Sequence, residues 1–96
     1  MPTYVTLIRY TEQGVKTFKD LPARLDETRK AGEALSTKLV AYYLTMGRYD
    51  AVVISEAPDD EAVAKLLLGA AGRGNVRTET LRAFDENEAK ELAAEL

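Results

Sequence analysis

The side chains in this sequence that can bind or polarise a small molecule are tyrosines, arginines and acids, because the chain contains no histidine and no cysteine. Without histidine it lacks the commonest general base and transition-metal ligand, and a Ser-His-Asp triad is excluded. Without cysteine it has no thiolate nucleophile and no thiolate metal ligand. We therefore expect no metal and no cofactor. The candidate ligand-binding residues are Arg9, Tyr43, Tyr49, Asp50, Arg77 and Glu79.

The most distinctive local string is Met46-Gly47-Arg48-Tyr49-Asp50. Gly47 can adopt backbone angles that other residues avoid, and the Asp50 carboxylate can accept hydrogen bonds from backbone N–H groups in a turn. One interpretation is a well-formed hairpin connection with Tyr49 packed on the sheet edge. The other places the Tyr49 hydroxyl and the Asp50 carboxylate at the mouth of a pocket. Local chemistry favours the hairpin.

Arg77 and Glu79 are two residues apart, so in a strand they share a face. An arginine–glutamate pair can bind a carboxylate or hold a catalytic base in place. The alternative is an ion pair on an edge strand or between two subunits, and this simpler interpretation is favoured because such pairs are common structural features.

Tyrosines form the third group of candidates. Tyr42 and Tyr43 are adjacent, so one should face the helices and the other a partner sheet. Together with Arg9 and Tyr10 they could line a pocket, because tyrosine combines an apolar ring with a polar tip. Packing in a core or an interface remains the simpler interpretation.

Hydrophobic patterning predicts the elements that position these residues. Alternating or continuous apolar runs predict strands over 3–10, 39–45, 51–55 and 76–84, and amphipathic spacing predicts helices after Asp20, Asp60 and Asp85. A short helical turn is expected within 12–19. Asp20 is expected to cap its helix with its carboxylate, and Asp59-Asp60 is expected to cap the second helix. Gly69, Gly72 and Gly74 are expected to end that second helix.

This order predicts an α+β fold of the ferredoxin-like βαββαβ type, an antiparallel four-stranded sheet with two helices on one face and a short C-terminal helix. The first and third strands should be central. The strands over 39–45 and 51–55 are apolar on both faces, which is typical of strands covered on both faces. Two helices cover only one face, so we expect a second copy to cover the other in a homodimer or higher oligomer. A monomer with an open apolar face is the alternative.

The chain also resembles a known family, both at its signature residues and at three longer segments. Gly47, Tyr49 and Asp50 match the Gly-x-Tyr-Asp signature of the GYD domain proteins. The segments 11–15, 56–62 and 74–84 are similar to the family's first loop, the start of its second helix and its last strand. The resemblance implies a ferredoxin-like domain of the dimeric α+β barrel type. It implies no established activity and no catalytic residue.

Length and charge limit the classes of function. The 96 residues, 46% of them hydrophobic, predict one domain over 1–96. The net charge of −3 lacks the basic excess of nucleic-acid binders, so no nucleic acid is expected. The apolar runs are too short to cross a membrane, so no membrane partner is expected. The absence of cysteine suits a cytoplasmic location, which we expect.

The expected function is that of an oligomeric domain that binds a small-molecule ligand beside or between its sheets. Relatives by fold include cofactor-independent monooxygenases and isomerases, so an enzyme of this kind acting on a small organic substrate is one alternative. A purely structural or assembly module is another. RNA recognition is disfavoured because the third strand is aliphatic where that module presents stacking aromatics.

Overall fold

Four strands form one antiparallel sheet in the order β2-β3-β1-β4, so β1 and β3 are central and β2 and β4 are the edges. This confirms the predicted ferredoxin-like arrangement. The computed structural model describes residues 1–96. Its elements are β1 (Thr3–Tyr10), α1 (Glu12–Lys16), a 3₁₀ turn (Phe18–Asp20), α2 (Leu21–Ala34), β2 (Lys38–Leu44), β3 (Ala51–Glu56), α3 (Asp60–Ala71), β4 (Val76–Ala83) and α4 (Glu86–Ala94).

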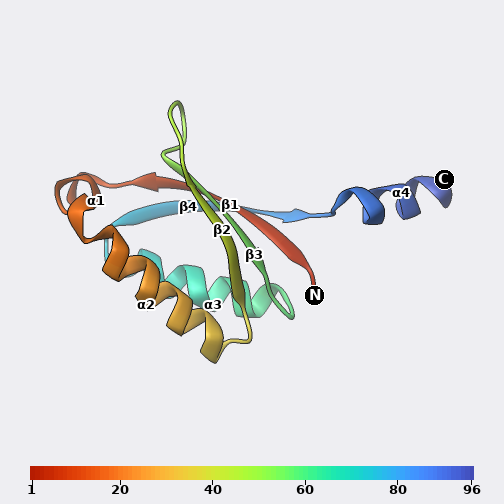
Figure 1. The fold of residues 1–96 in the computed structure, drawn as a ribbon, viewed down its shortest axis with the longest axis horizontal. Coiled ribbons are helices and arrows are strands. Elements are labelled where there is room, and N and C mark those ends of the chain that lie inside the picture. Colours follow the sequence, from red (N-terminus) through yellow and green to blue (C-terminus); the bar gives the residue numbers. More distant parts are fainter.

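One face of the sheet is covered by helices and the other is not. Figure 1 shows α2 and α3 on the same side of the sheet, whereas α4 stands away from the rest of the chain. We call the uncovered side the open face. Strand pairing places two rows of side chains across it, Tyr43–Val52–Leu7–Glu79 and Ala41–Ile54–Val5–Leu81.

The core between the sheet and the helices is thin. Only 11 of the 96 residues are buried, and no large side chain is completely enclosed. The main buried cluster consists of Tyr4, Ala57, Ala62 and Val63. A chain of this length buries only about two-thirds of its surface when it folds alone, so additional cover would add substantially to its stability.

Helix ends follow the sequence at two of three predicted caps. Asp59 accepts a hydrogen bond from the Ala62 N–H at 2.9 Å and starts α3, and Asp85 starts α4 with a reciprocal capping box. Asp20 precedes α2 as predicted, but its carboxylate makes no capping bond. Asp20 belongs to the 3₁₀ turn and has φ −83° and ψ 4°, not the extended conformation of a capping residue, and Pro22 has no N–H to donate. The expectation for the Asp20 side chain was therefore wrong. The expectation that Gly69 ends α3 was also wrong, because the helix continues to Ala71 and Gly72 is its C-cap.

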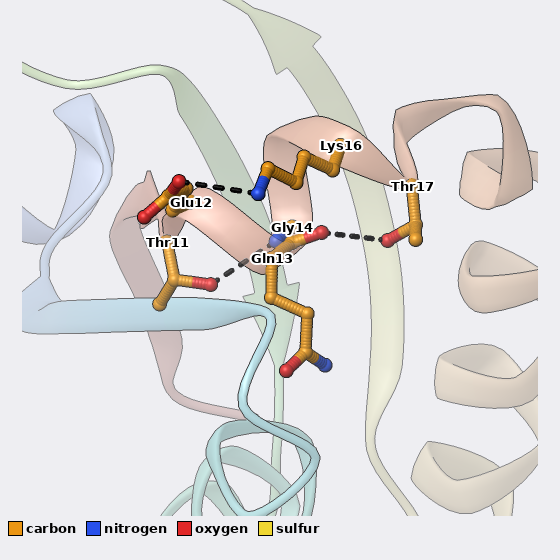
Figure 2. A network of polar contacts seen from close by, with 6 residues as sticks. All are labelled: Thr11, Glu12, Gln13, Gly14, Lys16 and Thr17. Carbon is orange, nitrogen blue, oxygen red and sulfur yellow. Dashed lines mark hydrogen bonds and ion pairs between the residues drawn. The ribbon is translucent and has the colours of Figure 1, made fainter.

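The first loop packs closely against the loop before β4. Figure 2 shows the polar contacts that form the turn, including the Thr11 hydroxyl accepting from the Gly14 N–H at 3.1 Å. The Thr11 N–H donates to the Asn75 carbonyl at 3.1 Å, and a Cβ placed on Gly14 would lie 2.2 Å from that same oxygen. Only glycine allows the two loops to approach this closely.

Strand β2 carries an irregularity. Its pairing with β3 shifts between Leu39 and Ala41, as in a β-bulge. Beyond the shift, Ala41 and Tyr43 lie on the open face, and Tyr42 lies on the face covered by the helices. The predicted placement of Tyr42 and Tyr43 on opposite faces of the strand is confirmed. The partner sheet expected opposite Tyr43 would belong to a second chain.

Candidate functional site

The turn at Gly47–Asp50 is built by backbone hydrogen bonds. Gly47 has a φ of 119°, which a residue with a side chain rarely adopts. The Asp50 carboxylate accepts from the Tyr10 N–H at 2.8 Å, and the Asp50 N–H donates to the Ile8 carbonyl at 2.8 Å. Asp50 therefore extends the bonding between β1 and β3 one residue before the start of β3 at Ala51. This geometry supports the hairpin interpretation for Gly47 and Asp50, because the carboxylate is already bonded to the backbone.

Three of the six candidate residues meet on the open face. The Arg9 guanidinium lies 4.9 Å from the centroid of the Tyr49 ring, which is within the range of a cation–π contact. The Arg9 Nε donates to the Arg48 carbonyl at 3.2 Å, and the Tyr49 hydroxyl donates to the Glu79 carboxylate at 3.3 Å. The β2–β3 turn thus folds Tyr49 over β1 toward β4. The result is a polar cluster of Arg9, Tyr49 and Glu79 at one end of an apolar face.

Tyr43 and Arg77 lie on the same face but outside this cluster. Tyr43 is 61% exposed and occupies the same row as Glu79, with Val52 and Leu7 between them. Arg77 pairs in register with Arg9. Arg77 and Glu79 share a face, as the sequence indicates, but no ion pair joins them. In the single chain these candidates line an exposed surface and not an enclosed pocket.

An apolar hollow lies on the other side of the sheet, between the strands and helices α2 and α3. Its volume is about 120 Å³, and none of the six candidates lines it. The hydroxyls of Tyr10 and Tyr42 meet at its wall, 2.8 Å apart. Burial raises the pKa of Tyr10, and the hydrogen bond with Tyr42 raises it further. Sequence analysis predicted both tyrosines as possible pocket residues. It could not tell that they face the helices whereas Tyr43 faces the open side, because this depends on which face the helices cover.

A second tyrosine ties the sheet to α3. The Tyr4 hydroxyl donates to the Asp60 carboxylate at 2.5 Å, at the first turn of α3. This bond to Asp60, followed by burial, raises the pKa of Tyr4. The Arg82 guanidinium lies near both Tyr4 and Phe84, with its central carbon 4.5 Å from the Phe84 ring centroid. Sequence analysis did not predict the contacts among Tyr4, Asp60 and Arg82, because Asp60 was interpreted as part of the helix cap.

The chain shows neither a metal site nor a membrane-spanning helix. No group of three or more acidic side chains lies close enough together to hold a metal ion. No helix has both the length and the apolar character that are needed to cross a membrane.

Comparison with known proteins agrees with the fold and the signature. A family model described as the GYD domain matches residues 4–93. A protein of Thermus thermophilus named "Glutamine synthetase and cystathionine beta-lyase binding protein" is 38% identical over 85 residues, which cover 88% of this chain and 90% of the relative.

Solved structures are similar as well. A crystal structure of a protein from Thermus thermophilus is 28% identical, with a TM-score of 0.55 over 88% of this chain and 95% of that one. The crystal structure of FFRP-DM1 has a TM-score of 0.57 over 88% of this chain and all of that one; at 17% identity it shows the fold alone. The family match spans the signature turn, both paired loops and all four strands, and the chain therefore belongs to the GYD domain family.

Proposed function

We propose that this chain is a homodimeric binding module that associates through its open sheet face and binds a metabolic enzyme. The observation that carries the proposal is the composition of that face. Val5, Leu7, Val52 and Ile54 form its centre and are only half-buried in the single chain. An apolar face of this extent is large for a monomer and is typical of an interaction surface.

A second copy is the simplest occupant of the open face. A two-fold axis through the centre of the sheet would place each apolar row opposite an identical row, as in an isologous dimer. The polar clusters of Arg9, Tyr49 and Glu79 would then lie toward the rim, where charged groups are tolerated. This is the dimeric α+β barrel arrangement that the family resemblance implies.

The enzyme partner is proposed from the relative. The Thermus protein is named for binding glutamine synthetase and cystathionine β-lyase, and the aligned part covers most of both chains. The comparison therefore concerns most of the domain over 1–96. A dimer uses the open face and leaves the outer surfaces of α2 and α3 for a protein partner. Such partners also agree with the cytoplasmic location expected from the sequence.

The dimer is tested by measuring the solution mass of the wild type and two variants by light scattering. Val52→Asp places a charge at the centre of the open face and should give a folded monomer. Leu68→Asp is the control, since Leu68 is 72% exposed on α3, which covers the opposite face. It should remain dimeric. A wild-type chain that is monomeric at micromolar concentration would contradict the dimer.

The enzyme partner is tested separately with purified glutamine synthetase and cystathionine β-lyase from the organism that encodes this chain. Co-elution of the wild type with at least one enzyme is expected, and Leu68→Asp should weaken it if the α3 surface is used. Failure to bind either enzyme, with the dimer intact, would reject the partner and leave the dimer in place.

Binding of a small organic acid between the sheets is the second candidate. Arg77 has no ion-pair partner in the single chain, and Arg9, Tyr49 and Glu79 lie on the same face. In the proposed dimer these groups would lie at the rim between the two sheets, and arginine is well suited to carboxylates. The expected ligand stabilises the wild type but not Arg77→Met in a thermal-shift screen of organic acids. If none shifts the wild type, neither ligand binding at this cluster nor a cofactor-independent reaction there is supported.

A further inference from the structure

A hollow that is partly open to solvent lies between the sheet and the helices, where a small domain normally has well-packed side chains. Protein interiors are packed about as densely as organic crystals, with few voids larger than a water molecule. Here a space of about 120 Å³ lies between the sheet and helices α2 and α3. Leu25 and Leu67 contribute to its walls from the two helices, and Ile8 and Val53 from the sheet.

The size and lining of the hollow suit one small ring. Hydrophobic residues make up 12 of the 19 that line it. An engineered apolar cavity of about 150 Å³ in another protein is large enough to bind benzene. A single aromatic ring is therefore close to the upper limit of what the present hollow can accept without movement of the helices.

The paired tyrosines supply one specific polar contact. When the Tyr10 and Tyr42 hydroxyls share a hydrogen bond of 2.8 Å, one hydrogen is used and the other remains free. Neither hydroxyl has a second protein partner. The free hydrogen of this half-buried pair can therefore donate to an acceptor atom on a ligand in the hollow.

The arginines at the hollow are already engaged. Arg24 donates to the Thr17 carbonyl at 2.8 Å, and it also donates to the Thr17 hydroxyl. Arg73 forms a 2.6 Å ion pair with Glu27 of α2. Arg73 is thus already paired with a carboxylate, and Arg24, although it keeps its charge, directs its donors at Thr17 and not into the hollow. An anion among the apolar side chains would therefore lack a direct partner, which favours an uncharged ligand.

We infer that the hollow between the sheet and helices α2 and α3 is a binding site for a neutral, single-ring aromatic molecule that carries one hydrogen-bond acceptor oxygen. The ring fills the space between Ile8, Val53 and Leu67, and the oxygen accepts from the Tyr10–Tyr42 pair. This site is on the opposite side of the sheet from the open face, so it does not depend on the proposed dimer or enzyme partner.

Three probes test the chemistry of the site by calorimetry and by NMR shift mapping on the full chain. Benzyl alcohol has the ring and the oxygen, toluene has the ring alone, and benzoate carries a charge. Benzyl alcohol and toluene should bind and shift the resonances of hollow-lining residues, whereas benzoate should not. No binding of either neutral probe, or shifts confined to the open face, would overturn the inference.

The polar contact is tested in the double variant Tyr10→Phe/Tyr42→Phe. Each single variant keeps one hydroxyl that can donate, so only the double variant removes the donor. We expect benzyl alcohol to bind about two- to tenfold more weakly, as for loss of one neutral hydrogen bond. Toluene should bind at least as well as to the wild type, which also shows that the hollow persists. Equal losses for both probes would reject the role of the tyrosines.

The location is tested by filling the hollow. Ala70→Leu adds bulk at a residue that lines it, and Ala64→Leu adds the same bulk at an exposed position of α3. Ala70→Leu should abolish binding of both neutral probes, and Ala64→Leu should leave it unchanged. Binding that survives Ala70→Leu in a folded protein would place the site elsewhere. The solution mass of each variant shows whether any loss of binding accompanies a loss of the dimer.

Discussion

The Asp50 carboxylate accepts a hydrogen bond from the backbone N–H of Tyr10 at 2.8 Å, which connects the β2–β3 turn to the end of the central strand β1. With the adjacent bond from the Asp50 N–H to the Ile8 carbonyl, it fixes how the turn lies over the sheet. The aspartate of the family signature thus has a structural role in this chain. The tyrosine of the signature instead reaches Glu79 on the open face.

Replacing Asp50 should therefore lower stability. Asp50→Ala leaves the half-buried Tyr10 N–H without its acceptor, and we expect the free energy of unfolding to fall by about 1–3 kcal/mol. Asp50→Asn keeps an acceptor oxygen and should cost less. Urea denaturation of both variants measures the difference. Asp26→Ala, at an exposed position of α2, is the control and should change stability little. Equal stability of Asp50→Ala and wild type would contradict this role.

Two glycine-to-alanine substitutions should change the free energy of unfolding in opposite directions. At Gly14 the added Cβ would meet the Asn75 carbonyl oxygen at 2.2 Å, so the two loops must separate. We expect Gly14→Ala to destabilise the chain by about 1–3 kcal/mol. At Gly69, inside α3, a Cβ meets nothing within 4 Å. Gly69→Ala should stabilise by roughly 0.5–1 kcal/mol, because alanine favours the helix. Thermal unfolding of the pair measures both effects, and a shared sign would refute the explanation.

Stability should decline at high pH partly because of Tyr10. Burial raises the pKa of Tyr10 in the folded chain above the value of about 10 for an unfolded tyrosine. The folded state therefore holds the phenol proton more tightly, and this contribution is complete below the unfolded pKa. It is lost as pH rises through the folded pKa.

The Tyr10→Phe variant removes this titration. Denaturation midpoints measured from neutral to strongly alkaline pH should fall less steeply for Tyr10→Phe than for the wild type. Below the unfolded pKa the two midpoints should differ by a constant amount, because the phenol is then protonated in both states. Parallel curves over the alkaline range would show that the Tyr10 phenol has no such effect.

Helix α4 should contribute to the proposed dimer and not to the fold of one chain. It stands away from the rest of the molecule in Figure 1, and Leu92 is 47% exposed. A short amphipathic helix without packing is only marginally stable, so we expect it to pack on the second copy. Leu92→Ala should weaken dimerisation by about 1–3 kcal/mol. Glu91→Ala on the neighbouring position is the control. Sedimentation equilibrium measures both, and an unchanged dimer affinity in Leu92→Ala would show that α4 does not contact the partner.

Periodicity was sufficient to predict the sheet. The alternation in β1 and the turn at Gly47 depend on neighbouring residues, so the order of elements could be predicted from the sequence. The general rule for crossover connections then placed β1 and β3 in the centre and β2 and β4 at the edges. The polar fourth strand, with Arg77 and Glu79 on one face, also agreed with an edge. These features rest on local chemistry, which a sequence contains directly.

The arrangement of side chains between elements could not be predicted in the same way. Tyr49 reaches Glu79 only because the turn folds across β1, and these residues are 30 positions apart. The hollow depends on how far α2 and α3 lie from the sheet, which is decided by many weak contacts together. The unused Asp20 cap shows the same limit at short range, because the 3₁₀ turn holds Asp20 outside the extended conformation that a capping residue needs.

The shifted pairing between Leu39 and Ala41 has a consequence for how the molecule can grow into larger assemblies. A regular, flat edge strand offers free N–H and C=O groups on which another chain can add, and repetition of that step produces fibrils. The irregularity in β2 interrupts this row of groups at one edge, and Arg77, Glu79 and Arg82 place charge along the strand at the other. Open-ended polymerisation through the sheet edges is thereby discouraged at both sides, which suits the finite, closed association through the sheet face proposed above.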